Sequence, residues 1–211
     1  NDGTFVLDSG EYSKMFAFTD INYTELRDEE KMRRLVDYSA LLNSIDKGIY
    51  AKISIFFRPI RQEQFERDVL IPMNPEDELD DYRENMNTVL REQVRGTLGM
   101  TKQAYLTITA GRRNDEDAAA FFARVDGNLI GSFQALGVEL RAVPLSERLR
   151  LLHDIYRPGL EETFRFDAHA EKKLGMNWKD SIAPLSAEAL NSCTYLKIGG
   201  RCCKTLFLNA Y

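Results

Sequence analysis

The amino-acid sequence predicts an α+β fold, and two kinds of pattern support this prediction. Residues 49–58 and 102–110 alternate between apolar and polar side chains, which is typical of β-strands with one face in the core. Segments starting near residues 28, 74 and 114 repeat apolar side chains every three or four positions, as amphipathic helices do. One sheet with helices on one face accounts for both patterns, because each element then buries its apolar side.

Composition and charge are those of an ordinary soluble globular protein. Of the 211 residues, 44% are hydrophobic, and 33 acids against 28 bases give a net charge of −5. This acidic balance disfavours bulk binding to nucleic-acid phosphates, which needs a dense basic surface. No apolar run approaches the roughly 18 residues that span a bilayer. The sequence begins at Asn1 without a methionine and stops at Tyr211, just beyond an apolar run, so we expect a fragment of a longer protein.

The first elements expected are a hairpin and a helix. Strands over 4–8 and 11–19 meet at Ser9-Gly10, a turn of the kind that glycine permits. A helix follows from Asp28, and Gly48 is expected to end it. Its apolar stripe comprises Met32, Leu35, Tyr38, Leu42 and Ile45.

The segment 49–58 is the clearest strand in the sequence, and its two faces differ. The face expected in the core is apolar: Ile49, Ala51, Ile53, Ile55 and Phe57. The other face, expected to be at least partly solvated, carries Tyr50, Lys52, Ser54, Phe56 and Arg58.

A proline-containing segment and a second helix follow. Pro59 and Pro72 make the segment between them a poor candidate for a helix interior or a central strand. Asn74 is expected to cap a helix whose first residue is Pro75, with acids in its first turn and a stop at Gly96 or Gly99. The apolar stripe of this helix comprises Leu79, Tyr82, Met86, Val89, Leu90 and Val94.

The remaining elements are predicted in the same way. The strand 102–110 turns Ala104, Leu106 and Ile108 to one face. Asn114 caps a third helix that Gly137 ends. Its stripe is the richest in the sequence: Ala118, Phe121, Phe122, Val125, Ile130, Phe133 and Leu136. Then come a strand over 138–143, a helix from Ser146, an irregular stretch to Ser192, and a hairpin of 193–198 with 201–208 around Gly199-Gly200.

These elements suggest a topology. If the helix over 76–98 is an insertion, residues 12–143 follow the order of a ferredoxin-like split βαβ core. Hairpins then stand at the N-terminal and C-terminal ends, and residues 144–211 supply a helix, the irregular segment and the last hairpin. We expect one non-motor domain over 1–211.

The sequence offers little catalytic chemistry. It contains no phosphate-binding GxxxxGK[ST] loop, GxSxG elbow or HExxH motif, so we expect no catalytic, cofactor-binding or metal-binding residues. His153 lies among leucines and is expected to be a packing histidine, and a metal site at His169 is disfavoured. The three cysteines are expected to be reduced, packed side chains, without an assigned role: Cys193, Cys202 and Cys203.

One surface is a candidate for docking a partner. Tyr50, Lys52, Phe56 and Arg58 share a strand face, and Tyr105 is expected on the same face of the neighbouring strand. Aromatic and basic side chains on an open sheet can stack nucleic-acid bases, although the RNP phrases of RNA-recognition modules are absent. The alternatives are a face covered by the inserted helix or by the terminal hairpins, or one docked against another protein.

Several phrases resemble the amino-terminal region of the TraC/TrbE-type ATPases of type IV secretion and conjugation, a VirB-class family. The likeness is greatest to versions on conjugative transposons of Gram-positive bacteria. The phrases are Gly10-Glu11-Tyr12-Ser13-Lys14, Phe18-Thr19-Asp20-Ile21-Asn22-Tyr23, Leu152-His153-Asp154-Ile155-Tyr156-Arg157-Pro158-Gly159, Tyr195-Leu196-Lys197-Ile198-Gly199-Gly200 and Leu206-Phe207-Leu208-Asn209-Ala210-Tyr211. Cys202 and Cys203 depart from the aromatic residue expected there.

The resemblance implies a non-catalytic docking and assembly domain. In this family the Walker motifs, and with them ATP and Mg²⁺, belong to a carboxy-terminal motor domain beyond this chain. The amino-terminal domain docks the motor at the cytoplasmic face of the inner membrane, contacts small membrane components of the transfer channel, and helps to arrange subunits. Self-association is compatible with that role. Two rivals stay open: a single-stranded nucleic-acid-binding module using the Tyr50 face, and a small enzyme built around His153, His169 and carboxylates.

Overall fold

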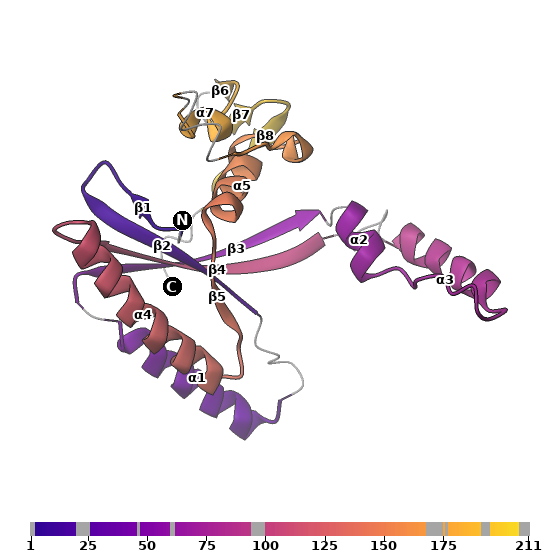
Figure 1. Ribbon diagram of the computed structural model, residues 1–211, viewed down its shortest axis with the longest axis horizontal. Helices are drawn as coiled ribbons and strands as arrows, with labels where there is room; N and C mark the ends of the chain where they lie inside the picture. Colours follow the sequence, from indigo (N-terminus) through magenta and orange to yellow (C-terminus); the bar gives the residue numbers. More distant parts are fainter. Residues whose placement is uncertain are drawn as a thin grey trace. The chain divides into compact units, whose positions relative to one another are not determined.

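The computed structural model confirms an α+β protein in which the paired strands are antiparallel (Figure 1). It describes residues 3–19, 26–45, 47–59, 62–93, 100–167, 175, 177–190 and 195–206. The chain divides into two compact units, residues 16–141 and residues 1–15 together with 142–211. The expectation of a single domain over 1–211 stays a prediction.

The larger sheet contains five strands in the described chain. They are β1 (Phe5–Val6), β2 (Glu11–Phe18), β3 (Ile49–Pro59), β4 (Met100–Gly111) and β5 (Leu140–Ala142). The order across the sheet is β1, β2, β4, β3, and β5 also pairs with β2. Thr19 N donates to Glu139 O at 3.1 Å. Earlier in β2, Met15 O accepts from Val143 N at 2.9 Å, so β5 runs antiparallel to β2.

Two helices of the unit 16–141, α1 (Asp28–Asn43) and α4 (Asp115–Ala135), lie side by side (Figure 1). The start of α4 is as predicted, because the Asn114 side chain accepts a hydrogen bond from Asp117 N at 2.9 Å. Its end is as predicted too, since Gly137 has a φ of 71°. The Arg34 guanidinium of α1 donates to the Leu136 carbonyl at the end of α4.

The core of this unit is built from β2, β4 and α4. Phe18 packs against Phe133 with the ring centroids 5.4 Å apart. The buried apolar side chains are Phe16, Leu106, Ile108, Phe121, Phe122, Leu129, Phe133, Leu136 and Val138. The predicted stripe of α4 is therefore confirmed at most of its positions, with Ile130 exposed.

The predicted inward stripe of α1 is wrong at Met32, Leu35 and Leu42, while Tyr38 and Ile45 are half-buried. Met32 is 62% exposed, and Leu35 and Leu42 are exposed as well. The side of α1 that meets α4 instead carries Arg34 and the buried Leu41. α1 also ends at Asn43, before Gly48, which has a φ of 83° and leads into β3. An amphipathic pattern fixes which residues share a helix face, but the neighbouring elements decide which face is covered.

The segment between β3 and β4 contains two helices, α2 (Gln62–Asp68) and α3 (Asp80–Gln93). The sequence missed α2, and the predicted helix start at Pro75 is wrong. The Asn74 side chain accepts from Glu76 N at 3.2 Å, so it closes a local turn and does not cap α3. This competition between turn and cap is a property of asparagine side chains.

A buried amide ties this insertion together. The Asn87 side chain is 2% exposed. It accepts from Ile71 N at 2.8 Å and donates to Ile71 O at 2.9 Å. Both polar groups of the Ile71 backbone are thereby satisfied against α3, which fixes the loop that precedes the helix.

The other unit is organised by α5 (Leu145–Tyr156) and a buried arginine. Arg148 is 5% exposed and donates to Gly3 O at 3.0 Å and to Ser13 O at 2.6 Å. Its guanidinium also lies 3.9 Å from the centre of the Phe5 ring. Burial lowers the pKa of Arg148 to about 10. A Cβ at Gly3 would stand 2.1 Å from Val143 O, so this close contact requires glycine.

The second sheet lies in the same unit. Its strands are β6 (Ala187–Leu190), β7 (Tyr195–Ile198) and β8 (Arg201–Cys203), preceded by a short 3₁₀ turn at Glu161–Thr163 and by α7 (Lys179–Ile182). The hairpin at Gly199-Gly200 is confirmed, as is the N-terminal one. β6 falls in the stretch expected to be irregular, and that expectation is wrong there. Its composition gives no local strand signal, so pairing with β7 defines it.

Candidate docking surface

The five predicted docking residues do share one face of the sheet. In the register of β3 with β4, Ser54 stands opposite Tyr105 and Phe56 opposite Gln103. Opposite residues of an antiparallel pair point to the same face, and alternate residues of β3 follow. The rings of Phe56 and Tyr105 lie with their centroids 5.9 Å apart. Tyr50, Lys52, Phe56, Arg58 and Tyr105 therefore form one surface, which we call the aromatic–basic face.

Exposure divides this face into two parts. Tyr50 is 71% exposed and Lys52 is also exposed. Phe56 and Arg58 are half-buried, and Tyr105 is only 4% exposed. The side chains at the start of β3 are accessible to a partner, whereas the Tyr105 side chain is buried in the protein.

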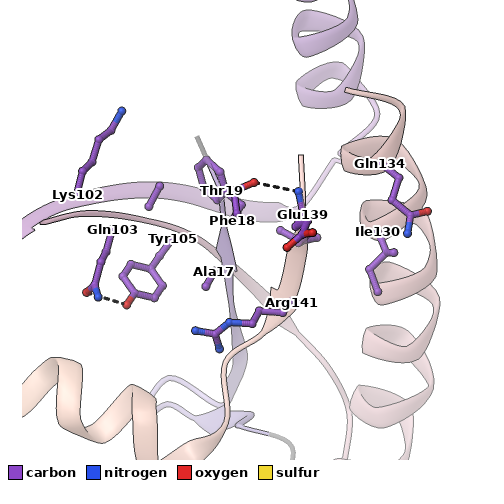
Figure 2. A pocket seen from close by; sticks show the side chains of 12 residues that line it. Ala17, Phe18, Thr19, Lys102, Gln103, Tyr105, Ile130, Gln134, Glu139 and Arg141 are labelled. Atoms are coloured by element: carbon purple, nitrogen blue, oxygen red, sulfur yellow. Dashed lines mark hydrogen bonds between the residues drawn. The ribbon is translucent and has the colours of Figure 1, made fainter. Parts of the chain in front are cut away.

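Tyr105 belongs to a groove in the unit 16–141, shown in Figure 2. The groove has a volume of about 720 Å³. Its lining comes from β2, β4, α4 and the start of β5: Ala17, Phe18, Thr19, Lys102, Gln103, Ala104, Tyr105, Ile130, Gln134, Glu139, Leu140 and Arg141. The Tyr105 hydroxyl donates to Gln103 Oε1 at 3.2 Å, and Glu139 N donates to Thr19 Oγ1 at 3.1 Å. The first bond lies within β4, and the second joins the residue after β2 to the residue before β5.

The opposite face of β3 was expected in the core, and that prediction is wrong. Phe57 is 66% exposed and Ile55 is 51% exposed, and Ile53 is exposed too. Directly across the sheet, Leu106 and Ala104 of β4 are buried. β3 is the last strand in the order of the described sheet, so its side chains have a neighbouring strand on one side only.

A second apolar surface lies on α3. Most of the predicted stripe faces solvent. Leu79, just before α3, and Tyr82, Met86 and Val89 are exposed, Tyr82 to 74%, whereas Leu90 is half-buried. Val94, Gly96 and Gly99 lie outside the described residues. An apolar helix face that is exposed in a single chain is typical of a surface that a binding partner covers.

Charged groups converge at the start of α3. Arg83 binds Asp77 at 2.5 Å and Asp80 at 2.7 Å. The hydrogen bond from Arg83, with one from Leu79 N, lowers the pKa of Asp77 to about 2. A hydrogen bond from Asn74 N and one from Arg83 lower the pKa of Asp80. The turn before α3 thus brings both carboxylates onto one arginine.

His153 occupies the interior of the other unit, as predicted. It is 1% exposed, with Nδ1 3.2 Å from Asp154 Oδ1 and its ring 5.2 Å from that of Phe164. Thr163 Oγ1 lies 3.5 Å from Nε2 and donates to Leu160 O. These contacts fix the ring in a packed environment.

The other candidate groups are only partly described. His169 and Cys193 lie outside the described residues, while Cys202 is exposed and Cys203 half-buried, both as free thiols. Within the described ranges, no three side chains of the metal-binding types gather into a possible ion site.

Membrane-spanning helices and similarity to known proteins were also assessed. In the part of the chain that the structure describes, no helix has the length and apolar character needed to cross a membrane. No family model and no curated protein matches this chain.

Proposed function

We propose that this chain is a non-catalytic docking and assembly domain of a TraC/TrbE-type ATPase of type IV secretion or conjugative transfer. In this role it anchors the motor, at the cytoplasmic face of the cell membrane, to inner-membrane components of the transfer channel. ATP and Mg²⁺ belong to the motor domain of the parent protein. The resemblance of the terminal phrases supports the family, and the uncovered stripe of α3 supports the docking role.

The topology supports a ferredoxin-like core. The elements occur in the order β2, α1, β3, β4, α4, β5, with α2 and α3 inserted between β3 and β4. The strand order with β5 beside β2 is β5, β2, β4, β3, and the β3–β4 and β2–β5 pairs are antiparallel. This succession and order are those expected of a split βαβ arrangement, which supports the proposal that residues 12–143 form a ferredoxin-like core.

The single observation that carries the docking role is the exposed stripe of α3 in an acidic setting. Residues 60–99 contain ten acids and five bases, whereas the rest of the chain contains 23 of each. The net charge of the chain therefore resides in this insertion. An apolar stripe flanked by acids fits an amphipathic partner segment rich in lysine and arginine. Cytoplasmic segments of membrane proteins carry such an excess of basic residues.

A peptide-binding measurement tests this docking surface. The probe is a synthetic amphipathic helix of lysine and leucine, with a glutamate and leucine helix of the same pattern as the charge control. We expect the basic peptide to bind more weakly as salt rises. Leu79→Ser with Met86→Ser should weaken binding by about tenfold, since a lost buried contact costs about 1.4 kcal/mol.

The matched control is Met32→Ser with Leu35→Ser, which changes an equally exposed apolar pair on α1 and should leave binding unchanged. Equal affinity for the acidic peptide, or equal losses in the two double variants, would contradict the proposed surface. Binding to vesicles of anionic lipid would assign it to a membrane instead of a protein. The family assignment has its own test, because the parent reading frame should encode a Walker A loop downstream of this chain.

The alternative is a single-stranded nucleic-acid-binding module, and the exposure of Tyr50 and Lys52 is the observation in its favour. The burial of Tyr105 removes one of the stacking rings that it needs. A salt titration of single-stranded DNA binding separates the two functions. Steep salt dependence, with loss of binding in Lys52→Ala and Arg58→Ala, would favour the alternative.

A further inference from the structure

The outer edge of β3 has no strand partner in the part of the chain that the structure describes. β3 is 11 residues long, and it ends the strand order beyond β4. The backbone N–H and C=O groups along such an edge pair readily with another strand. Proteins commonly block long edges with charges or internal prolines, but β3 carries only Lys52 and Arg58 as charges and has its proline at the last position, Pro59.

Side chains on both faces of β3 are accessible. Tyr50 and Lys52 are exposed on the aromatic–basic face, and Ile53, Ile55 and Phe57 are exposed on the other. A strand added at this edge would therefore cover apolar surface on both faces of the sheet and also satisfy the edge hydrogen-bonding groups. Of the described strands, β3 best meets both conditions.

We propose that β3 pairs with β3 of a second copy of this chain, antiparallel about a two-fold axis through Ser54. The sequence of β3 is complementary to itself in this register. Residues that stand opposite each other across the two copies are Ile53 with Ile55, Lys52 with Phe56, Ala51 with Phe57, and Tyr50 with Arg58. Opposite side chains of an antiparallel pair lie on one face within contact distance, so Ile53 meets Ile55 and Ala51 meets Phe57 on the apolar face.

The positions of the two cations favour this register over the one centred on Ile55. About Ser54, each cation stands opposite an aromatic ring, an arrangement that favours contact of the ring with the cation and its apolar stem. If the axis moves to Ile55, Lys52 stands opposite Arg58 of the other copy. Like charges directly opposite destabilise a strand pair. Charge placement therefore favours pairing about Ser54 over pairing about Ile55.

The proposed assembly is a closed dimer. Both copies use the same edge, so a two-fold pair is complete and leaves no further β3 edge to recruit a third copy. This inference rests on the proposed assembly function and specifies one partner, a second copy, at a surface other than α3. The two proposals can fail separately, because peptide binding to α3 and self-association through β3 are measured independently.

Analytical ultracentrifugation with charge-swapped variants tests the pairing. The wild-type chain should sediment as a dimer that dissociates on dilution. Ile53→Lys with Ile55→Lys places lysine opposite lysine, and Ile53→Glu with Ile55→Glu places glutamate opposite glutamate, so each variant alone should be monomeric. An equimolar mixture of the two should regain about twice the monomer mass as a heterodimer.

The control is Met32→Lys with Leu35→Lys, which adds the same charge to an exposed apolar pair on α1 and should leave the dimer intact. Far-UV circular dichroism should show unchanged folding in all variants, because every substituted side chain is exposed. A wild-type chain that stays monomeric at every concentration would overturn the proposal. A dimer that persists in the lysine pair, a mixture that fails to associate, or a dimer that the α1 variant breaks equally would do so too.

Discussion

β3 and β4 are paired residue by residue along their length, yet one strand is largely exposed and the other largely buried. Ile53 stands directly opposite Leu106, but Ile53 is 41% exposed and Leu106 is 1% exposed. Both strands alternate apolar and polar residues, and the sequence alone predicts the same environment for both. The difference comes from their places in the sheet, since β4 lies between two strands and β3 ends the described order.

Alternation and burial are therefore separate properties of a strand. Alternation determines which side chains share a face of a strand. Burial requires a second layer and neighbouring strands, which are supplied by parts of the chain remote in sequence. An apolar strand face without that cover is a surface for a partner, which is why β3 enters the proposed assembly.

The greatest loss of stability is expected at Leu106, in the buried strand β4. Leu106→Ala should lower the free energy of unfolding by about 3 kcal/mol, because it removes a fully buried side chain and leaves a cavity. Ile53→Ala, directly opposite, should cost less than about 1 kcal/mol in the monomeric chain, since that side chain already contacts water. Urea denaturation at low protein concentration measures both. Equal losses for the two variants would show that β3 is covered in solution.

A smaller effect is expected for the tyrosines of the aromatic–basic face. Tyr105→Phe removes the buried hydroxyl that donates to Gln103, and it should cost about 1 kcal/mol. Tyr50→Phe should have no measurable effect on the stability of the monomer, because its hydroxyl is in an exposed side chain. Thermal unfolding of the two variants checks this contrast. A destabilised Tyr50→Phe variant would mean that this end of β3 is buried.

The smallest effect concerns pH and the insertion that joins β3 to β4. The pKa of Asp77 is lowered from 3.8 to about 2, so its ionised contacts with Arg83 stabilise the folded insertion at pH values above the unfolded pKa. That contribution should disappear as the pH falls from about 4 through about 2. The difference in amide-exchange protection of α3 between wild type and Asp77→Asn should shrink over this range. If the difference in protection between the two proteins does not change with pH, the ionised Asp77 side chain does not stabilise α3 through Arg83.

The parts of the fold that depend on local chemistry could be predicted from the sequence. Asn114 marks the start of α4 and Gly137 its end. Both could be predicted, because a side-chain cap and a left-handed glycine depend only on residues a few positions away. The Gly199-Gly200 hairpin follows from the same kind of local preference. Asn74 shows the limit of such signals, because the same amide can cap a helix or close a turn, and here it closes a turn.

The sequence predicted which residues share the aromatic–basic face, but it did not predict how exposed each of them is. The register of β3 with β4 places Tyr50 and Tyr105 on one face, as the two alternating patterns predicted. The burial of Tyr105 could not be predicted, because it depends on a groove wall made from β2, α4 and β5 as well as β4. The outward stripe of α1 was missed for a related reason, since Arg34 rather than Met32 meets the end of α4.

Local patterns in the sequence specified most of the strands and helices, which side chains share a face, and where the negative charge of the chain is concentrated, but not α2, the start of α3 or β6. These properties follow from backbone geometry and from side chains within a few positions of each other. Only the tertiary structure decided that β3 is an edge, that the stripes of α1 and α3 face outward, and that Arg83 joins Asp77 and Asp80. Coverage is a relation between segments far apart in the chain, and periodicity within one segment does not specify its neighbours.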